Sequence, residues 1–247
     1  MDVTLSRLML VVQANLAWTL ALVLSGRTGP GLLGTYTSER VPVIAEMLRR
    51  STEILDATFR GEEAKVMALR RDPALRQLSV NYQWSTAVYD ERREGGRAPE
   101  PQGAYGGSGA PGLWAGDRAP NAPDLRVFGD AERLTGLFDL LSLAKHTILV
   151  FSGQNTPQED VRSFLDVAAR QPAGTCQTIL VFDQVPQDTN MQTLADVAVV
   201  DTNGYASQFY ATSTGVRAVA VRPDAVVGAM VKTADGLASA LGLVFNA

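Results

Sequence analysis

The sequence predicts an α/β protein in which two helices precede a domain built around a small mixed sheet. From about residue 124 onward, short runs rich in β-branched residues alternate with helical patterns, as is typical of α/β folds. The last two of these runs flank a turn that contains proline, so we expect them to pair antiparallel. Before residue 60, the apolar residues follow a helical rather than a strand-like period.

The first predicted helix contains Leu8 to Leu24, a run without a charged side chain. A membrane-spanning helix needs about 20 predominantly apolar residues, and Gln13, Asn15 and Thr19 interrupt this one. The apolar run of a signal peptide is shorter, about 7 to 15 residues. We therefore expect a buried helix, with a signal peptide or a membrane anchor as the alternative.

A loop at Gly26 to Gly31 separates this helix from a second one. The second helix has an apolar stripe at spacings of three and four, which we expect to be buried. That stripe consists of Val41, Ile44, Leu48, Ser51 and Leu55, whereas Glu39, Glu46, Arg49, Arg50, Glu53 and Asp56 lie off it and are expected in water. Two helices cannot bury their apolar faces alone, so an exposed apolar patch is also expected.

The stretch from Gly95 to Gly112 is crowded with Gly, Pro, Ser and Ala, which indicates a flexible linker. We place a domain boundary there. The predicted units are a helical segment at 1–60, a connecting segment at 61–94, the linker at 95–112 and the sheet domain at 113–247.

In the sheet domain, helical patterns separate most of the β-rich runs. The predicted strands are Asp124–Phe128, Thr147–Phe151, Gln177–Phe182, Val197–Val200, Arg217–Val221 and Val226–Met230. The predicted helices are Ala131–Leu143, Pro157–Arg170, Gly204–Ala211 and Thr233–Leu241. Helices against a small mixed sheet, ending in a hairpin and a helix, form an outline that resembles a thioredoxin-like domain.

Three motifs in the first half carry a resemblance to a known family. The run Asn15–Leu24 and the pattern Tyr36-x-x-Glu39-Arg40-x-Pro42 resemble the helix pair that closes the flavin-binding half of FAD-dependent aromatic hydroxylases of the phenol hydroxylase-like class. Tyr82, Ser85 and Asp90 match a segment of the form Tyr-x-x-Ser-x-x-x-x-Asp in the same class.

Two more motifs follow in the family's order. Gly116 to Leu125 resembles the start of its C-terminal thioredoxin-like domain, and Val221 to Asp224 resembles its closing Val-Arg-Pro-Asp-Gly hairpin. This chain has Ala225 in place of the glycine, and because alanine resists a positive φ, we expect a type I turn. The resemblance covers about Asn15 to the C-terminus, and the order of the motifs makes it specific.

The resemblance implies an oxidoreductase in which NAD(P)H reduces FAD and an aromatic ring is hydroxylated, with the C-terminal domain serving architecture and dimerisation. Such enzymes hold the FAD pyrophosphate in a Gly-x-Gly-x-x-Gly turn between a strand and a helix. No such turn lies between a predicted strand and helix here. The glycines from Gly103 to Gly109 are expected to have the wrong spacing, and Met1 to Gln13 does not match the family's second flavin contact.

We therefore expect the chain to be the C-terminal portion of such a monooxygenase, with a helical segment detached from the flavin-binding domain, and to be inactive and without bound FAD when alone. No catalytic or cofactor-binding residue is assigned. Whether Met1 is the true start of the protein decides this interpretation.

Other catalytic chemistry finds little support. One cysteine and one histidine exclude a disulfide, a CxxC redox pair and a multi-histidine or cysteine-based metal site. Cys176 is expected to be a small buried residue. His146 could act as a base for Ser142 or Ser152, but it follows Lys145 in what we expect to be a surface turn, so we expect it in water. The stretch Gly106–Ala110 only approximates a nucleophile elbow. The carboxylates Asp90, Glu91, Asp139 and Asp183 are expected to be single and exposed.

The net charge of −4 and the pI near 5.1 give no basic footprint, so nucleic acid is not expected as a partner. The alternative function is a stand-alone, non-redox thioredoxin-like interaction module that acts with a flavoprotein in trans. The expected partners are a second copy in a homodimer or a flavin domain, and the expected location is the cytoplasm. A membrane-anchored or secreted thioredoxin-like protein is a third possibility, if Leu8 to Leu24 inserts.

Overall fold

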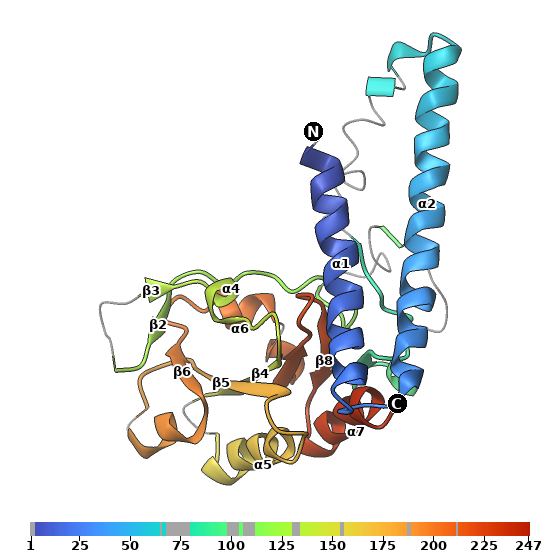
Figure 1. Ribbon diagram of the computed structural model, residues 1–247. Coiled ribbons are helices and arrows are strands. Elements are labelled where there is room, and N and C mark those ends of the chain that lie inside the picture. Colours follow the sequence, from blue (N-terminus) through green and yellow to red (C-terminus); the bar gives the residue numbers. More distant parts are fainter. Residues whose placement is uncertain are drawn as a thin grey trace.

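The computed structural model describes residues 3–64, 66–67, 80–97, 104–105, 112–129, 134–153, 156–186, 189–210 and 212–247. Figure 1 shows a sheet with helices around it and two long helices that project away from it. These are α1 (Val3–Leu24) and α2 (Leu33–Phe59), joined by a turn that contains the 3-10 helix η1 (Pro30–Leu32). Among the described residues, no helix combines the length and apolar character that a membrane span requires.

Within the described residues the sheet has eight strands in the order β1-β8-β7-β4-β5-β6-β2-β3. The three central strands β4, β5 and β6 are parallel, while β7 pairs antiparallel with both β4 and β8. The strands are β1 (Tyr89–Asp90), β2 (Leu125–Val127), β3 (Leu134–Thr135), β4 (His146–Ser152), β5 (Cys176–Phe182), β6 (Val197–Val200), β7 (Ala218–Val221) and β8 (Val227–Val231).

Helices and loops cover both faces of this sheet. Along β4, Ile148 and Val150 belong to one buried cluster and Leu149 and Phe151 to another, because successive strand residues point to opposite faces. The first cluster includes residues of α1, α5 and α7, and the second includes residues of α4, α6 and the 113–122 loop. The helices are α4 (Leu137–Leu140), α5 (Gln158–Ala169), α6 (Tyr205–Phe209) and α7 (Ala234–Phe245), and the short 3-10 helices are η3 (Glu94–Gly96), η4 (Thr189–Leu194) and η5 (Thr212–Thr214).

The structure confirms the α/β class and all six predicted strands, with ends that differ by at most a residue or two. One predicted helix, at 131–143, is wrong. Residues 131–133 lie outside the described part of the chain, Leu134–Thr135 forms an edge strand, and α4 is a single turn that starts after Gly136. The linker predicted at 95–112 also lies mostly outside the described residues.

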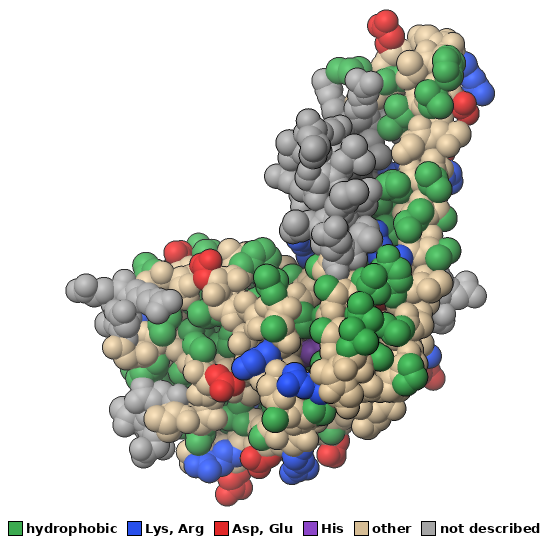
Figure 2. Space-filling view, in the orientation of Figure 1, with side chains coloured by type: hydrophobic (Ala, Val, Ile, Leu, Met, Phe, Trp, Pro, Cys, Tyr) green, Lys and Arg blue, Asp and Glu red, His purple; other side chains and the backbone are tan. Residues whose placement is uncertain are grey.

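The expected burial of the α2 stripe is wrong. Val41, Ile44, Leu48 and Leu55 are between 40% and 57% exposed, whereas Glu39, expected in water, is 1% exposed. Helix α2 turns Thr35, Glu39, Arg40 and Val43 toward the rest of the chain instead. The exposed apolar patch expected of the helix pair is present: Figure 2 shows hydrophobic side chains along α2 and on α1, where Leu16, Leu20 and Leu24 are also exposed.

The hairpin between β7 and β8 turns at Arg222–Ala225, as predicted. The amide of Ala225 donates to the carbonyl of Arg222 at 3.0 Å, which closes a β-turn with Pro223 at its second position. Among the described non-glycine residues only Asp124 and Ala225 have a positive φ, so Asp224 does not meet the requirement of a type II turn. The expectation that alanine avoids a positive φ is wrong, because Ala225 has a φ of 59° in the bulge that follows the turn.

We expect Ala225→Gly to stabilise the protein. A left-handed conformation costs an alanine roughly 1–2 kcal/mol, and the greater freedom of glycine in the unfolded chain offsets part of that gain. The free energy of unfolding in urea should rise by about 0.5–1 kcal/mol. Ala45→Gly, at an exposed position inside α2, is the control and should lower it by about 1 kcal/mol. Equal losses in the two variants would contradict the strain at Ala225.

Candidate functional site

A buried ionic network lies where the two long helices meet the sheet domain. Its centre is Arg222 at the end of β7, whose side chain is 0% exposed. The guanidinium donates to both carboxylate oxygens of Glu39 on α2, at 2.8 and 3.0 Å, and to Asp224 in the hairpin turn, at 2.6 and 3.1 Å. Glu39 and Asp224 are 1% and 3% exposed, so all three charges are removed from water.

Helix α1 contributes two polar side chains to this network. Asn15 donates from its amide nitrogen to Glu39 at 2.7 Å and to Asp224 at 3.0 Å, and Trp18 donates from its indole nitrogen to Asp224 at 3.3 Å. The Trp18 ring also lies 4.9 Å from the guanidinium carbon of Arg222. Asn15 and Trp18, at the start of the chain's first motif, are therefore hydrogen-bond donors for buried carboxylates.

The 80–85 segment closes the network from the other side. Ser85 donates its hydroxyl to Glu39 at 2.5 Å, and the Tyr82 hydroxyl accepts from Arg40 at 2.9 Å. Pro42 has no amide hydrogen, so the carbonyl of Ser38, four residues earlier in α2, lacks its helical donor. The indole nitrogen of Trp84 donates to that carbonyl at 3.0 Å.

The electrostatics fix the charge states of the network. Burial opposes the ionisation of Asp224, but the charge of Arg222 and the hydrogen bonds from Arg222, Asn15 and Trp18 outweigh it and lower the pKa of Asp224. Burial likewise acts to lower the pKa of Arg222, and the charges of Asp224 and Glu39 raise it above its usual range. Neither Asp224 nor Arg222 is poised to exchange a proton near neutral pH, so the pair fastens the hairpin to α1 and α2 rather than performing acid–base chemistry.

A second buried ion pair lies beside it. Asp90 was expected to be exposed, and that prediction is wrong: it is 0% exposed, accepts two hydrogen bonds from Arg92 at 2.7 and 2.8 Å, and accepts another from the amide of Ala115 at 3.1 Å. Arg92 and Arg93 each place a guanidinium over the ring of Trp114, at 4.4 and 4.3 Å. In the Tyr-x-x-Ser-x-x-x-x-Asp motif, Tyr82 and Ser85 thus contact residues of the first network, whereas Asp90 forms the second ion pair.

The remaining predicted carboxylates have structural or exposed positions. Glu91 is half-buried rather than exposed, and it accepts hydrogen bonds from the amide and hydroxyl of Thr233, at 3.1 and 2.8 Å, just before α7. Asp139 and Asp183 are exposed, as expected.

His146 is not in water, which corrects the prediction. It is 2% exposed at the start of β4, with the rings of Trp18 and Phe245 at 5.2 and 5.5 Å. Burial and then the charge of Arg222 lower its pKa to about 4. Ser152 lies at the opposite end of the same strand, and Ser142 accepts from the amides of the 144–145 turn, so neither forms a nucleophile–base pair with His146.

Cys176 begins β5 and is partly buried beside the first core cluster. Burial raises the pKa of its thiol to about 11, which is unfavourable for a redox or nucleophilic role. Within the described residues there is also no cluster of three or more metal-ligating side chains. The stretch Gly106–Ala110, which approximates a nucleophile elbow, lies outside the described residues.

The Gly-x-Gly-x-x-Gly spacing does occur, at Gly29–Gly34 and at Gly107–Gly112, so the expectation of wrong spacing is wrong. The second occurrence lies almost wholly outside the described residues. The first joins two helices rather than a strand and a helix, and a Cβ at Gly29 would come within 2.1 Å of the carbonyl oxygen of Ala247. The glycine there serves a close approach of two backbone segments, and it does not fit a phosphate cradle.

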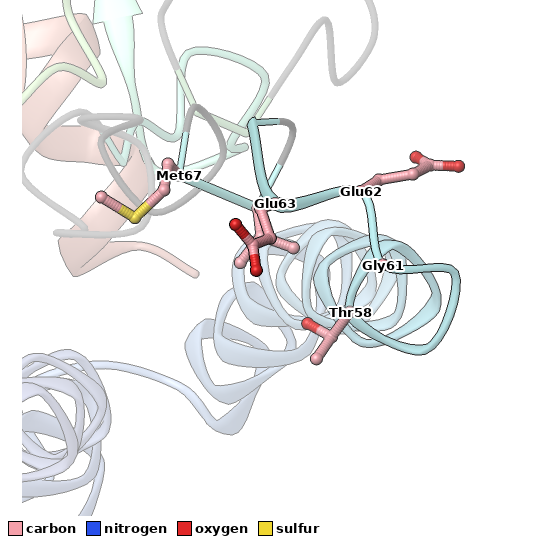
Figure 3. A pocket seen from close by; sticks show the side chains of 6 residues that line it. Thr58, Gly61, Glu62, Glu63 and Met67 are labelled. Carbon is pink, nitrogen blue, oxygen red and sulfur yellow. The ribbon is translucent and has the colours of Figure 1, made fainter.

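An open hollow of about 310 Å³ lies at the far end of α2, lined by Thr58, Gly61, Glu62, Glu63, Val66 and Met67. Figure 3 shows the side chains of Glu62 and Glu63 pointing in different directions, so their carboxylates do not converge on one point. None of the predicted site residues lies in this hollow.

Parts of the chain are similar in sequence to known flavin-binding proteins. Residues 13–51 match the FAD binding domain family. A flavin-dependent monooxygenase of Mycobacteroides abscessus is 31% identical over 147 residues, which are 60% of this chain and 25% of that protein. A phenol 2-monooxygenase of a Pseudomonas species is 38% identical over 71 residues, 24% of this chain and 12% of that protein. The chain spans a quarter or less of the length of these curated relatives.

A solved structure of the flavin-dependent monooxygenase PieE, in complex with FAD and substrate, aligns with a TM-score of 0.60 at 19% identity. The alignment covers 95% of this chain and 43% of PieE, so the two share a fold over nearly the whole of this chain. The expected relationship to FAD-dependent monooxygenases is therefore confirmed, while the phenol hydroxylase-like class and the thioredoxin-like domain stay predictions.

Proposed function

We propose that the chain is the C-terminal part of an FAD-dependent aromatic-ring monooxygenase of the phenol hydroxylase-like class. The observation that supports this most directly is that the separate motifs of the resemblance meet in space. Asn15, Glu39, Ser85 and Arg222 come from four different motifs, and Asn15, Ser85 and Arg222 all hydrogen-bond to the Glu39 carboxylate. Their common contact with Glu39 gives a physical reason why these motifs occur together in one chain.

The sheet topology supports a thioredoxin-like identity for the C-terminal domain. Strands β4 and β5 are parallel with α5 between them, and the antiparallel hairpin β7–β8 lies on the other side of β4 and is followed by α7. The chain has one cysteine, and the raised pKa of its thiol argues against disulfide chemistry. We assign this domain an architectural role.

In this proposal α1 and α2 are the last helices of the flavin-binding half, and the rest of that half covers their exposed apolar stripe. FAD would supply the oxidative chemistry and NAD(P)H the electrons in the complete enzyme, located in the cytoplasm. The residues described here do not fit the FAD pyrophosphate, because the glycine turn at Gly29–Gly34 is closed by Ala247. We expect the chain alone to bind no FAD.

The test is a titration of the purified chain with FAD, followed by flavin fluorescence and by gel filtration. We expect no saturable binding and no NADH or NADPH oxidation, whereas an intact flavin-dependent monooxygenase treated in the same way serves as the positive control. Stoichiometric flavin in the purified chain would contradict the assignment. Sequencing of the transcript through its 5′ end is the complementary test, because the proposal expects a reading frame that continues upstream into a strand, a Gly-x-Gly-x-x-Gly turn and a helix.

The second candidate function is a stand-alone interaction module that dimerises or docks on a flavoprotein in trans. The exposed stripe of α2 favours it, since Val41, Ile44, Leu48 and Leu55 form one apolar seam. Leu48→Glu should lower the self-association measured by light scattering after gel filtration, and Arg49→Glu, at a neighbouring exposed position, serves as the control. A wild-type chain that is monomeric and binds no flavoprotein would remove this candidate.

A further inference from the structure

Arg40 is a buried cation of α2 that the network around Arg222 leaves aside. It is 1% exposed, and the only hydrogen bond that the described residues give its side chain runs from Nη1 to the Tyr82 hydroxyl at 2.9 Å. Its Nε and Nη2 atoms are buried and have no acceptor in the described part of the chain. No carboxylate among the described residues forms an ion pair with it, because Glu39 and Asp224 both engage Arg222.

The two nitrogens in question form one edge of the guanidinium plane. Their N–H groups are nearly parallel, which is the arrangement that holds the two oxygens of a carboxylate or a phosphate in a bidentate pair. Charged donors that are buried without an acceptor are costly. The Nε and Nη2 atoms of Arg40 are therefore free to donate two parallel hydrogen bonds to one oxyanion.

A second donor, Tyr105, belongs to the same buried cluster as Tyr82, the residue that accepts from Arg40. Tyr105 is 7% exposed, and its buried hydroxyl has no hydrogen-bond partner in the described residues. Burial raises the pKa of Tyr105 and the charge of Arg40 acts to lower it, so the two groups are electrostatically coupled. Tyr105 packs in one cluster with Val43, Val80 and Trp84, and the guanidinium carbon of Arg50 lies 5.7 Å from the centroid of its ring.

We propose that Arg40 and Tyr105 form a binding site for a small oxyanion, a carboxylate or a phosphate. Nε and Nη2 of Arg40 would hold two of its oxygens, and the Tyr105 hydroxyl would donate a third hydrogen bond. The neighbouring network carries two carboxylates and one guanidinium, which opposes a further negative charge. We therefore expect weak binding, with a dissociation constant on the order of 1 mM.

The experiment measures the unfolding temperature of the purified chain in formate, acetate or phosphate, with chloride at the same ionic strength as the reference. At an oxyanion concentration about ten times the dissociation constant, we expect the wild-type chain to gain about 3–5 °C over chloride. The comparison of formate and acetate with phosphate tells which oxyanion the site prefers.

Three variants test the residues. Arg40→Met should remove the gain, Tyr105→Phe should reduce it, and Arg49→Met, on the exposed face of the same helix, should leave it unchanged. If Arg40→Met does not fold, Tyr105→Phe and the wild-type salt series still test whether an oxyanion binds at this site. Equal unfolding temperatures of the wild type in all salts, or an undiminished gain in Arg40→Met or Tyr105→Phe, would overturn the proposal.

Discussion

Arg222→Met should cost the protein about 3–5 kcal/mol of its free energy of unfolding, the largest effect we expect of any single substitution. The methionine removes the one cation that pairs with both Glu39 and Asp224, so two carboxylates stay buried, 1% and 3% exposed, without a counter-charge. Chemical denaturation followed by circular dichroism measures the change. The unfolding temperature should fall by roughly 10 °C or more.

Two controls separate the burial of charge from a general effect of losing an arginine. Arg49→Met removes an ion-paired arginine whose side chain is 54% exposed, and it should cost no more than about 0.5 kcal/mol. The triple variant Arg222→Met, Glu39→Gln and Asp224→Asn should recover part of the loss, because it no longer buries unpaired charge. Similar losses in Arg222→Met and Arg49→Met would show that the network does not hold the helices to the sheet.

His146 should make the protein lose stability between about pH 6.5 and pH 4. Its pKa is about 4 in the folded chain and 6.5 as the ordinary value, so between these values the unfolded state binds the proton and the folded state does not. The contribution is complete above pH 6.5 and is lost as the pH falls toward 4. The gap corresponds to roughly 3 kcal/mol.

The measurement is a series of urea denaturation curves at pH values from 7 to 4 for the wild type and for His146→Phe. Phenylalanine keeps a ring between Trp18 and Phe245 but cannot be protonated, so the variant should be nearly flat across this window. Asp224 acts in a lower range, because its pKa is lowered in the folded chain and its contribution is lost as the pH falls below its ordinary value of 3.8. The same slope in the variant and the wild type would show that His146 is not the titrating group.

The strands were predictable because both faces of the sheet are covered. Long β-branched runs such as Thr147–Phe151 and Gln177–Phe182 bury every second side chain on each face, and that leaves a clear pattern in the sequence. Strands β1 and β3 have two residues each, and their pairing depends on neighbours far along the chain. Such short strands leave no local signal.

The site was predictable only in its parts. The motifs that contain Asn15, Glu39, Ser85 and Arg222 could be recognised one by one, but their contact is a tertiary fact that no spacing encodes. The α2 stripe was misread for the same reason, since periodicity identifies an apolar face without saying whether this chain or another surface covers it. His146 was misread because its neighbour Lys145 suggested a surface turn, whereas α1 and α7 cover it.

The buried network also constrains the order in which the protein can fold. Asn15 contacts Asp224 across 209 positions of sequence, and Glu39 contacts Arg222 across 183. During synthesis, α1 and α2 therefore leave the ribosome long before the residues that neutralise Glu39 have been made. Until Arg222 has been made, Glu39 has no cation to pair with in this network, so the network is completed as one of the last steps of folding.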